Sequence, residues 1–146
     1  MSWMNEANIG IARLFNIYGE GQNPNYAGVI ARFLGRVKNR EPLTIFGNGE
    51  QTRDFIHVFD VSRAVLNVVD KRAEGVFNIA TGKPTSINEL ARKMLHLANM
   101  ENMPEYMPAR IGDIEHSYAN IGKAVKELDW QPAVELEEGL RELLYS

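Results

Sequence analysis

Apolar and polar positions follow one another along the chain in short blocks that predict strands and helices in turn. Residues 9–18 (IGIARLFNIY) are rich in β-branched and aromatic side chains and stop at Gly19, which predicts a mostly buried strand running into a loop. Apolar residues from Ala27 to Leu34 recur with the spacing of one helix face, so a helix is expected from Pro24-Asn25 to about Asn39.

The remaining blocks continue this alternation. Further strands are predicted at 43–46, 54–58 and 76–80, and further helices at 60–72, 86–99, 121–128 and 136–144. Asp60 is expected to cap the first of these helices, and Ser86 with Glu89 forms a capping box at the start of the second. No repeat or linker divides the chain, so we expect one α/β domain over residues 1–146.

Composition narrows the function classes. Sixteen basic and nineteen acidic residues give a formal net charge of -3 without a basic run, which argues against a nucleic-acid partner. The chain has no cysteine, so disulfides and thiolate metal sites are excluded. No apolar stretch approaches the roughly 20 residues that a membrane helix needs, and the first residues do not read as a signal peptide. We therefore expect a cytoplasmic protein with no membrane partner.

Two glycine pairs, Gly19 with Gly21 and Gly47 with Gly49, suggest a dinucleotide-binding loop but lack its third glycine. Ordinary turns are the better interpretation. The three histidines, at 57, 96 and 116, lack metal-ligand spacing, and no nucleophile motif is present.

Asn16, Arg53 and Arg110 stand at predicted junctions of loops and strands, each close to a glycine. Their side chains are donors of the kind that bind a diphosphate. A structural ion pair between arginine and a neighbouring aspartate is the alternative interpretation, and it is the more common one.

A series of motifs gives this hypothesis more weight. In chain order they are R-x-x-N-x-Y-G from Arg13, P-L-x-I-x-G-x-G-x-Q-x-R-D-F-I-x-V-x-D-V from Pro42, F-N-I-A-x-G from Phe77, S-I-x-E-L from Ser86, R-x-G-D from Arg110 and L-x-W-x-P-x-x-x-L-E-E-G-L from Leu128. From about Ile9 to Leu144 the chain resembles the NAD-dependent epimerases and dehydratases of the extended short-chain dehydrogenase/reductase (SDR) family.

The resemblance implies the C-terminal, substrate-binding portion of a Rossmann-like fold, with the N-terminal NAD-binding strands and helices missing. Such enzymes bind NAD through G-x-x-G-x-x-G and transfer protons with a Tyr-x-x-x-Lys pair. Neither motif occurs here. We therefore expect the isolated chain to be catalytically inactive and not to bind NAD tightly.

The resemblance also implies roles for individual residues. Asn16, Arg53 and Arg110 correspond to ligands of the phosphates, and Asp113 corresponds to an acidic residue near the ribose. Leu43 and Ile45 belong to the segment that lines the base pocket. Leu14 corresponds to a position near the nicotinamide. Ser117, four places after Asp113, corresponds to the residue beside C2 of the sugar, where a small side chain admits an N-acetyl group.

The leading hypothesis is the substrate-binding part of a nucleotide-sugar 4-epimerase, with a UDP-hexose as the expected ligand and a dehydratase or decarboxylase as related possibilities. A free-standing, non-catalytic sugar-nucleotide-binding or assembly module is the alternative from another class. The strand at Ile9–Tyr18 is expected to lack its neighbours, and an exposed apolar edge favours a homodimer or a larger assembly.

Overall fold

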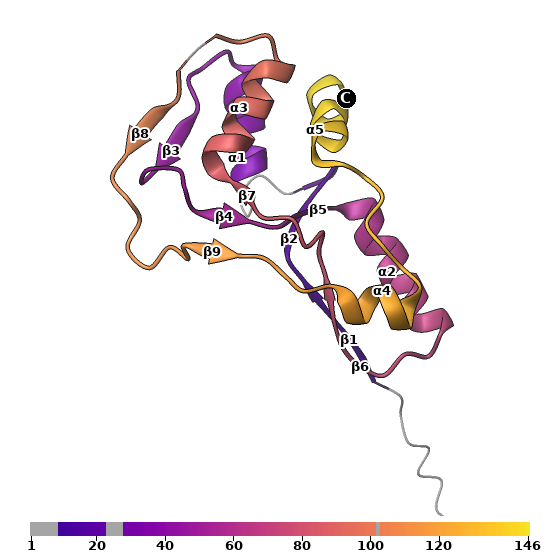
Figure 1. Cartoon of the computed structure of the whole chain (residues 1–146). Helices are drawn as coiled ribbons and strands as arrows, with labels where there is room; N and C mark the ends of the chain where they lie inside the picture. The colour runs from indigo at the N-terminus through magenta and orange to yellow at the C-terminus, as the bar shows by residue number, and fades with distance from the viewer. Residues whose placement is uncertain (1–8, 23–27, 102) are drawn as a thin grey trace, which may run out of the picture.

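A computed structural model describes residues 9–22, 28–101 and 103–146. The helices of this part of the chain are α1 (Val29–Lys38), α2 (Val58–Asp70), α3 (Ile87–Leu97), α4 (Gly122–Leu128) and α5 (Leu136–Tyr145). Its strands are β1 (Gly10–Leu14), β2 (Asn16–Tyr18), β3 (Thr44–Phe46), β4 (Thr52–Arg53), β5 (Phe55–His57), β6 (Gly75–Ile79), β7 (Thr85–Ser86), β8 (Glu105–Met107) and β9 (His116–Ser117). The α/β class is confirmed (Figure 1). The expected helix start at Pro24-Asn25, and Ala27, lie outside the described residues.

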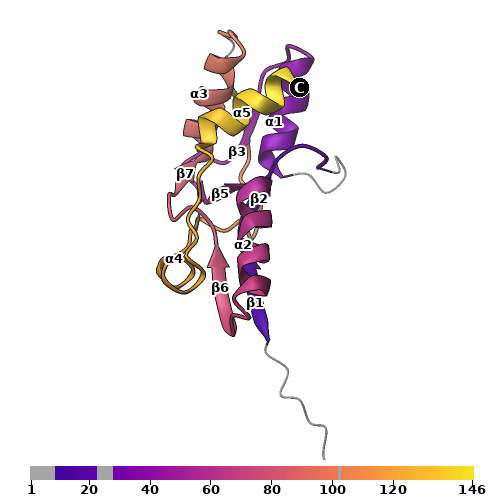
Figure 2. The same cartoon turned by 90° about the vertical axis from the view of Figure 1, so that its right-hand side faces the viewer.

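The single strand expected at residues 9–18 is wrong, because the chain changes its strand partner at Phe15. β1 pairs in parallel with β6, whereas β2 pairs in parallel with β5 (Figure 2). At the change, the Phe15 amide donates to the Ile79 carbonyl at 3.3 Å and the Asn16 amide donates to the Asp54 carbonyl at 3.1 Å. β6 ends at Ile79, so the residues that follow β1 must form their backbone hydrogen bonds with another strand.

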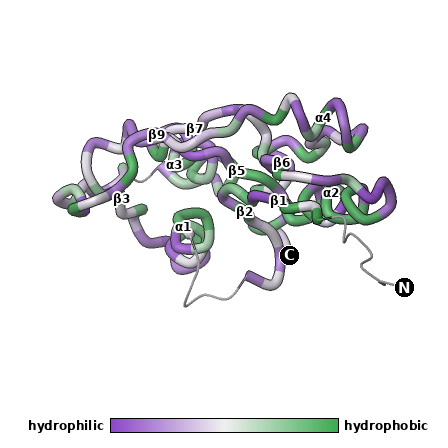
Figure 3. The backbone as a smooth tube through the Cα atoms, turned by 90° about the horizontal axis from the view of Figure 1, so that it is seen from below, coloured by the Kyte–Doolittle hydropathy of each residue, from purple (hydrophilic) through white to green (hydrophobic). Residues whose placement is uncertain are grey.

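β1 is also not the mostly buried strand that its composition predicts. In the described part of the chain, β1 has β6 on one edge and no strand on the other. Ile11 and Leu14 are 51% and 44% exposed. Apolar residues also run along the neighbouring helix α2 (Figure 3), and several of them are exposed: Val58, Phe59, Val65, Leu66 and Val69.

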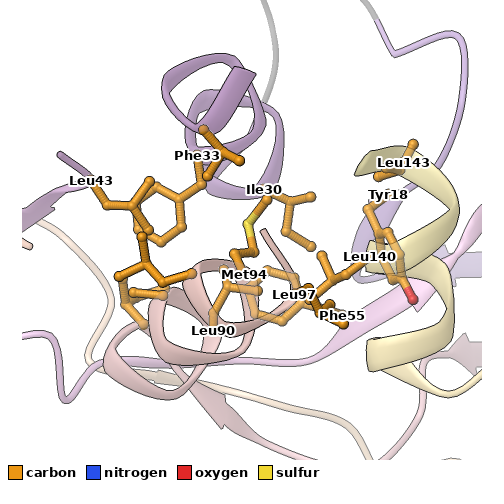
Figure 4. Close-up of a cluster of buried hydrophobic side chains, with 14 of the residues drawn as sticks. Tyr18, Ile30, Phe33, Leu43, Phe55, Leu90, Met94, Leu97, Leu140 and Leu143 are labelled. Atoms are coloured by element: carbon orange, nitrogen blue, oxygen red, sulfur yellow. The ribbon is translucent and has the colours of Figure 1, made fainter. Parts of the chain in front are cut away.

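Two hydrophobic clusters form the core, and strand β5 contributes to both. The first lies where α1, α3 and α5 pack together, and it includes Tyr18 and Phe55 (Figure 4). The second lies under α2 and α4 and includes Ile56 and Phe77. Successive side chains of a strand point to opposite faces, so Phe55 and Ile56 join the two clusters through one strand.

The Ser86 half of the capping box expected for α3 is confirmed, because the Ser86 hydroxyl accepts a hydrogen bond from the Glu89 amide at 3.1 Å. The Glu89 carboxylate lies 3.6 Å from the Lys93 ammonium. The cap expected for α2 is wrong. His57 precedes this helix, and its Nδ1 accepts from the Phe59 amide at 3.3 Å. Asp60 lies inside the first turn, where its buried carboxylate accepts from the amides of residues 133 and 134 at 3.0 Å.

The helices expected near the C-terminal end are confirmed as α4 and α5. Among the described residues, none of the helices has both the length and the apolar character required to cross a membrane.

Candidate anion-binding site

A buried carboxylate, that of Asp54, lies beside the site. Asp54 is fully buried, and one of its oxygens accepts from the Thr81 amide and hydroxyl at 2.8 and 2.6 Å. The other accepts from the amides of Gly82 and Ala119 at 2.9 and 3.3 Å. Four donors compensate for the burial of one charge. Asp54 thereby ties three separate segments together next to Arg53.

Arg53 lies in β4, between β7 and β9, with Ser117 as its register partner on β9. Its guanidinium donates to the Thr52 carbonyl at 2.8 Å and to the Asp113 carboxylate at 2.5 Å. Arg53 therefore forms a structural ion pair, but not with a neighbouring aspartate as considered from the sequence, because its partner is Asp113 and not Asp54. The Thr52 carbonyl thus holds one terminal nitrogen of the guanidinium, and the Asp113 carboxylate holds the other.

A cavity of about 210 Å³ opens in front of Arg53. Its lining comes from β2, α1, β3, β4, α3 and the loops around them: Asn16, Val29, Arg32, Thr44, Ile45, Phe46, Gln51, Arg53, Ile87, Arg110 and Asp113. Three of these residues are arginines and one is an aspartate, so the lining carries a formal excess of two positive charges. The cavity is suited to an anion with two negative charges.

An aromatic side chain forms one wall. The Arg110 guanidinium carbon lies 3.9 Å from the centroid of the Phe46 ring, in a cation-π contact. The Gln51 amide donates to the Phe46 carbonyl at 2.8 Å and so fixes the end of β3. A second cavity of about 480 Å³ shares Phe46, Gln51, Arg110 and Asp113, which extends the site beyond the arginines.

Helix α1 begins at the cavity, because its first residue, Val29, is part of the lining. The N-cap is Gly28, which offers no side-chain acceptor, and the first turn contains no acidic residue. The amides of a first helical turn carry partial positive charge. Asn16, also part of the lining, donates weakly to the Asp54 carbonyl at 3.4 Å.

Arg32 is the charged member of this lining that sequence reasoning missed. Partial burial lowers the pKa of Arg32, and the positive charge of Arg110 lowers it further, while Asp113 acts in the opposite direction. Arg32 and Arg110 line the same cavity, so their like charges repel one another. The available signal was the pair of arginines, Arg32 and Arg36, one turn apart on a helix without acidic residues.

The structure brings five of the predicted site residues together in this lining: Asn16, Ile45, Arg53, Arg110 and Asp113. The others lie elsewhere. Leu43 is fully buried in the first core cluster, one residue before β3. Ser117 is partly buried on β9 next to Arg53, outside the lining. Leu14 is exposed at the end of β1.

Within the described residues, no group of three or more histidine, cysteine, aspartate or glutamate side chains could hold a metal ion. The paired glycines form turns, with φ of +74° at Gly47 and +78° at Gly49. Gly49 leads into strand β4 and not into a helix. The described residues therefore do not fit the phosphates of a dinucleotide cofactor at this turn.

Comparison with known proteins relates the chain to one enzyme family. The model of the "NAD dependent epimerase/dehydratase family" matches residues 2–80. The chain is 36% identical over 127 residues to the UDP-glucose 4-epimerase of Mycolicibacterium smegmatis, a match that covers 86% of this chain and 41% of the relative.

Solved structures show the same similarity in three dimensions. UDP-glucose 4-epimerase from Thermotoga maritima, with UDP-glucose, matches with a TM-score of 0.86 and 39% identity. UDP-N-acetylglucosamine 4-epimerase from Methanobrevibacter ruminantium, in complex with UDP-N-acetylmuramic acid, matches with a TM-score of 0.88 and 34% identity. Each match covers 93% of this chain and 44% of the solved one, so the chain spans less than half the length of these relatives.

Proposed function

The chain belongs to the NAD-dependent epimerase/dehydratase family, and on that premise we propose that it is the nucleotide-sugar-binding part of a 4-epimerase. The proposed ligand is a UDP-hexose. Two of the similar solved structures contain UDP-sugars, namely UDP-glucose and UDP-N-acetylmuramic acid. We propose further that the chain corresponds to the C-terminal, substrate-binding portion of its longer relatives.

The charge of the cavity is the observation that carries this proposal. The lining has a formal excess of two positive charges, and the diphosphate of a nucleotide sugar carries one ionised oxygen on each phosphate. Guanidinium groups bind such oxygens through paired hydrogen bonds. The first turn of α1 adds amide donors to the lining, and Asn16 adds a side-chain amide.

The other parts of the ligand have candidate partners around the arginines. Ile45 and Phe46 line the cavity at the end of β3 and would contact the base. One oxygen of Asp113 accepts from Arg53, which leaves the second oxygen available for a ribose hydroxyl. Leu43, buried in the same core cluster as Ile45, would support this wall without touching the ligand.

The chemistry of a 4-epimerase requires groups that this sequence does not contain. NAD, where bound, accepts and returns the hydride. The sequence has neither G-x-x-G-x-x-G nor Tyr-x-x-x-Lys, so we propose that the chain binds and orients the nucleotide sugar while another part or protein supplies NAD and the proton-transferring groups. Leu14, exposed at the carboxyl end of β1, would face that part.

For the isolated chain, we propose self-association through β1. An open strand edge presents unpaired amide and carbonyl groups, and the neighbouring apolar residues of β1 and α2 favour burial. A second copy offers the same edge and the same apolar side chains, so two copies can cover one another about a two-fold axis. Binding of the NAD-supplying part to this edge would compete with that pairing.

The alternative function is a non-catalytic module that binds a nucleotide sugar and pairs with a separate Rossmann protein. The coding DNA immediately upstream of Met1 separates the two proposals. An in-frame G-x-x-G-x-x-G and Tyr-x-x-x-Lys would support the enzyme, whereas a stop codon followed by a ribosome-binding site would support the module.

Ligand binding itself can be tested by an NMR titration of the chain with UDP. The proposal expects the guanidinium signals of Arg53 and Arg110 to shift, while those of Arg141, an exposed residue of α5, stay in place. Millimolar UDP that leaves Arg53 and Arg110 unperturbed contradicts both the enzyme and the module.

A further inference from the structure

Arg32 has a position that the family motifs do not assign. It lies in the first half of α1 and lines the cavity in front of Arg53. It also lines an adjoining cavity of about 210 Å³ between α1 and β3, together with Arg36 and Phe46. Arg110 lines both of these cavities. Arg32 and Arg110 therefore share one continuous surface.

The ion pairs around the cavity do not include these two arginines. Arg53 pairs with Asp113, the one carboxylate of the lining. Within residues 9–22, 28–101 and 103–146, neither Arg32 nor Arg110 forms an ion pair with an acidic side chain. The excess of two positive charges is thus located on Arg32 and Arg110.

Helix α1 does not stabilise the charge of Arg32. The residue four places before it is Gly28, and the residue four places after it is Arg36, a like charge that is unfavourable at this spacing. Arg36 has its own partners, because it donates to the Pro42 carbonyl at 2.7 Å and lies 3.9 Å from Glu41. The repulsion between Arg32 and Arg110 is the second unfavourable contribution.

We infer that Arg32 binds the diphosphate of the nucleotide sugar jointly with Arg110, as a third guanidinium beside Arg53. The inference rests on the proposed function. An anion between Arg32 and Arg110 removes their mutual repulsion and gives each a charge-assisted hydrogen bond. Arg53, oriented by Asp113, then contributes hydrogen-bond geometry, while the other two arginines balance the ligand charge.

Calorimetry with uridine, UMP and UDP tests this assignment in the whole chain. Arg32→Gln removes the charge and keeps a good helix former, so the fold is expected to remain intact, as circular dichroism can verify. UDP affinity is expected to fall about tenfold, the effect of losing one charge-assisted hydrogen bond. Uridine affinity is expected to stay unchanged. Arg32→Lys keeps the charge without the planar fork and should give an intermediate loss.

Lys38→Gln is the matched control, because it removes one positive charge from the exposed last turn of the same helix. It should leave UDP affinity unchanged. If the unaltered chain binds UDP and Arg32→Gln binds it equally well, the inference is wrong and the proposed function stands. An equal loss for uridine and UDP also overturns it, because Arg32 then contacts the nucleoside. If the unaltered chain binds no UDP, the proposed function itself fails.

Discussion

The Arg53 guanidinium donates to the Asp113 carboxylate at 2.5 Å, although the two residues are 60 positions apart in the chain. This ion pair joins β4 to the turn that follows Arg110, and it lines the cavity on which the proposed function rests. Because Asp113 compensates Arg53, the excess positive charge of the cavity falls on Arg32 and Arg110. Arg53 is therefore the arginine whose orientation is fixed by an ion pair, whereas Arg32 and Arg110 are the arginines that would balance the charge of the ligand.

Asp54 follows Arg53 in the chain and its carboxylate binds two other segments, so its replacement should destabilise the fold. In Asp54→Asn, an amide group would face backbone donors that the carboxylate now accepts, such as the amides of Gly82 and Ala119. We expect a loss on the order of 3 kcal/mol in the free energy of unfolding. Urea denaturation measures it. Asp70→Asn, at the exposed end of α2, should change stability by less than about 0.5 kcal/mol.

Tyr18→Phe should stabilise the chain. The Tyr18 hydroxyl is buried without a hydrogen-bond partner among the described residues, and its removal should raise the unfolding free energy by about 1 kcal/mol at pH 7. Tyr118→Phe, at an exposed position, should have little effect. Equal unfolding curves for Tyr18→Phe and the unaltered chain would show that the hydroxyl is satisfied by solvent.

The same residue predicts a loss of stability at alkaline pH. Burial raises the pKa of Tyr18, and the nearby carboxylates of Asp60 and Glu142 raise it further. As pH rises above about 10, the unfolded chain therefore loses this proton before the folded chain does. The contribution of the protonated Tyr18 hydroxyl to the free energy of unfolding is complete below about pH 10 and declines above it. Between pH 8 and 11, the free energy of unfolding measured by urea denaturation should fall more steeply with pH for the unaltered chain than for Tyr18→Phe.

The sequence predicts features that depend on neighbouring residues. Ser86 and Glu89 are three positions apart, and the expected hydrogen bond at the start of α3 is present. The change of strand partner at Phe15 could not be predicted, because it depends on where β6 ends, more than 60 residues later. His57 replaced Asp60 as the cap of α2, since the Asp60 carboxylate binds amides more than 70 positions away.

In the site, too, some residues could be predicted from the sequence and others could not. Motifs pointed to Asn16, Arg53, Arg110 and Asp113, and the structure brings these four residues to one cavity. Arg32 belongs to no such motif, so its place in the lining emerges only when α1 packs beside β3. Leu43 lies one residue before β3 and is buried in the same core cluster as Ile45, and the run L-T-I-F does not reveal that, of these two, only Ile45 also belongs to the lining.

We propose that Ser117 influences which sugar the site accepts. It lies on β9 beside Arg53, where we expect a small side chain to leave space for an N-acetyl group. Ser117→Tyr should lower the affinity of UDP-N-acetylglucosamine about tenfold relative to that of UDP-glucose, because the added ring occupies this space. Calorimetry with both ligands measures the ratio. An equal loss for the two sugars would assign Ser117 a purely structural role.

The open edge of β1 is expected to make the isolated chain self-associate. Light scattering at micromolar concentration should show a dimer or larger species. Ile11→Lys places a charge among the exposed apolar residues of β1 and should shift the mass toward the monomer. Ile111→Lys makes the same substitution at a fully exposed site elsewhere and should not. A monomeric unaltered chain would contradict the proposed pairing.

The central claim is that the arginine-lined cavity binds the diphosphate of a nucleotide sugar, and the affinity of the chain for UDP tests it most directly. Calorimetry should show saturable binding that Arg53→Gln weakens at least tenfold and that Arg53→Gln combined with Arg110→Gln abolishes. Arg141→Gln, in the exposed pair with Glu137 on α5, is the control. Equal UDP affinity in all four proteins, or no binding by the unaltered chain at millimolar UDP, would contradict the account.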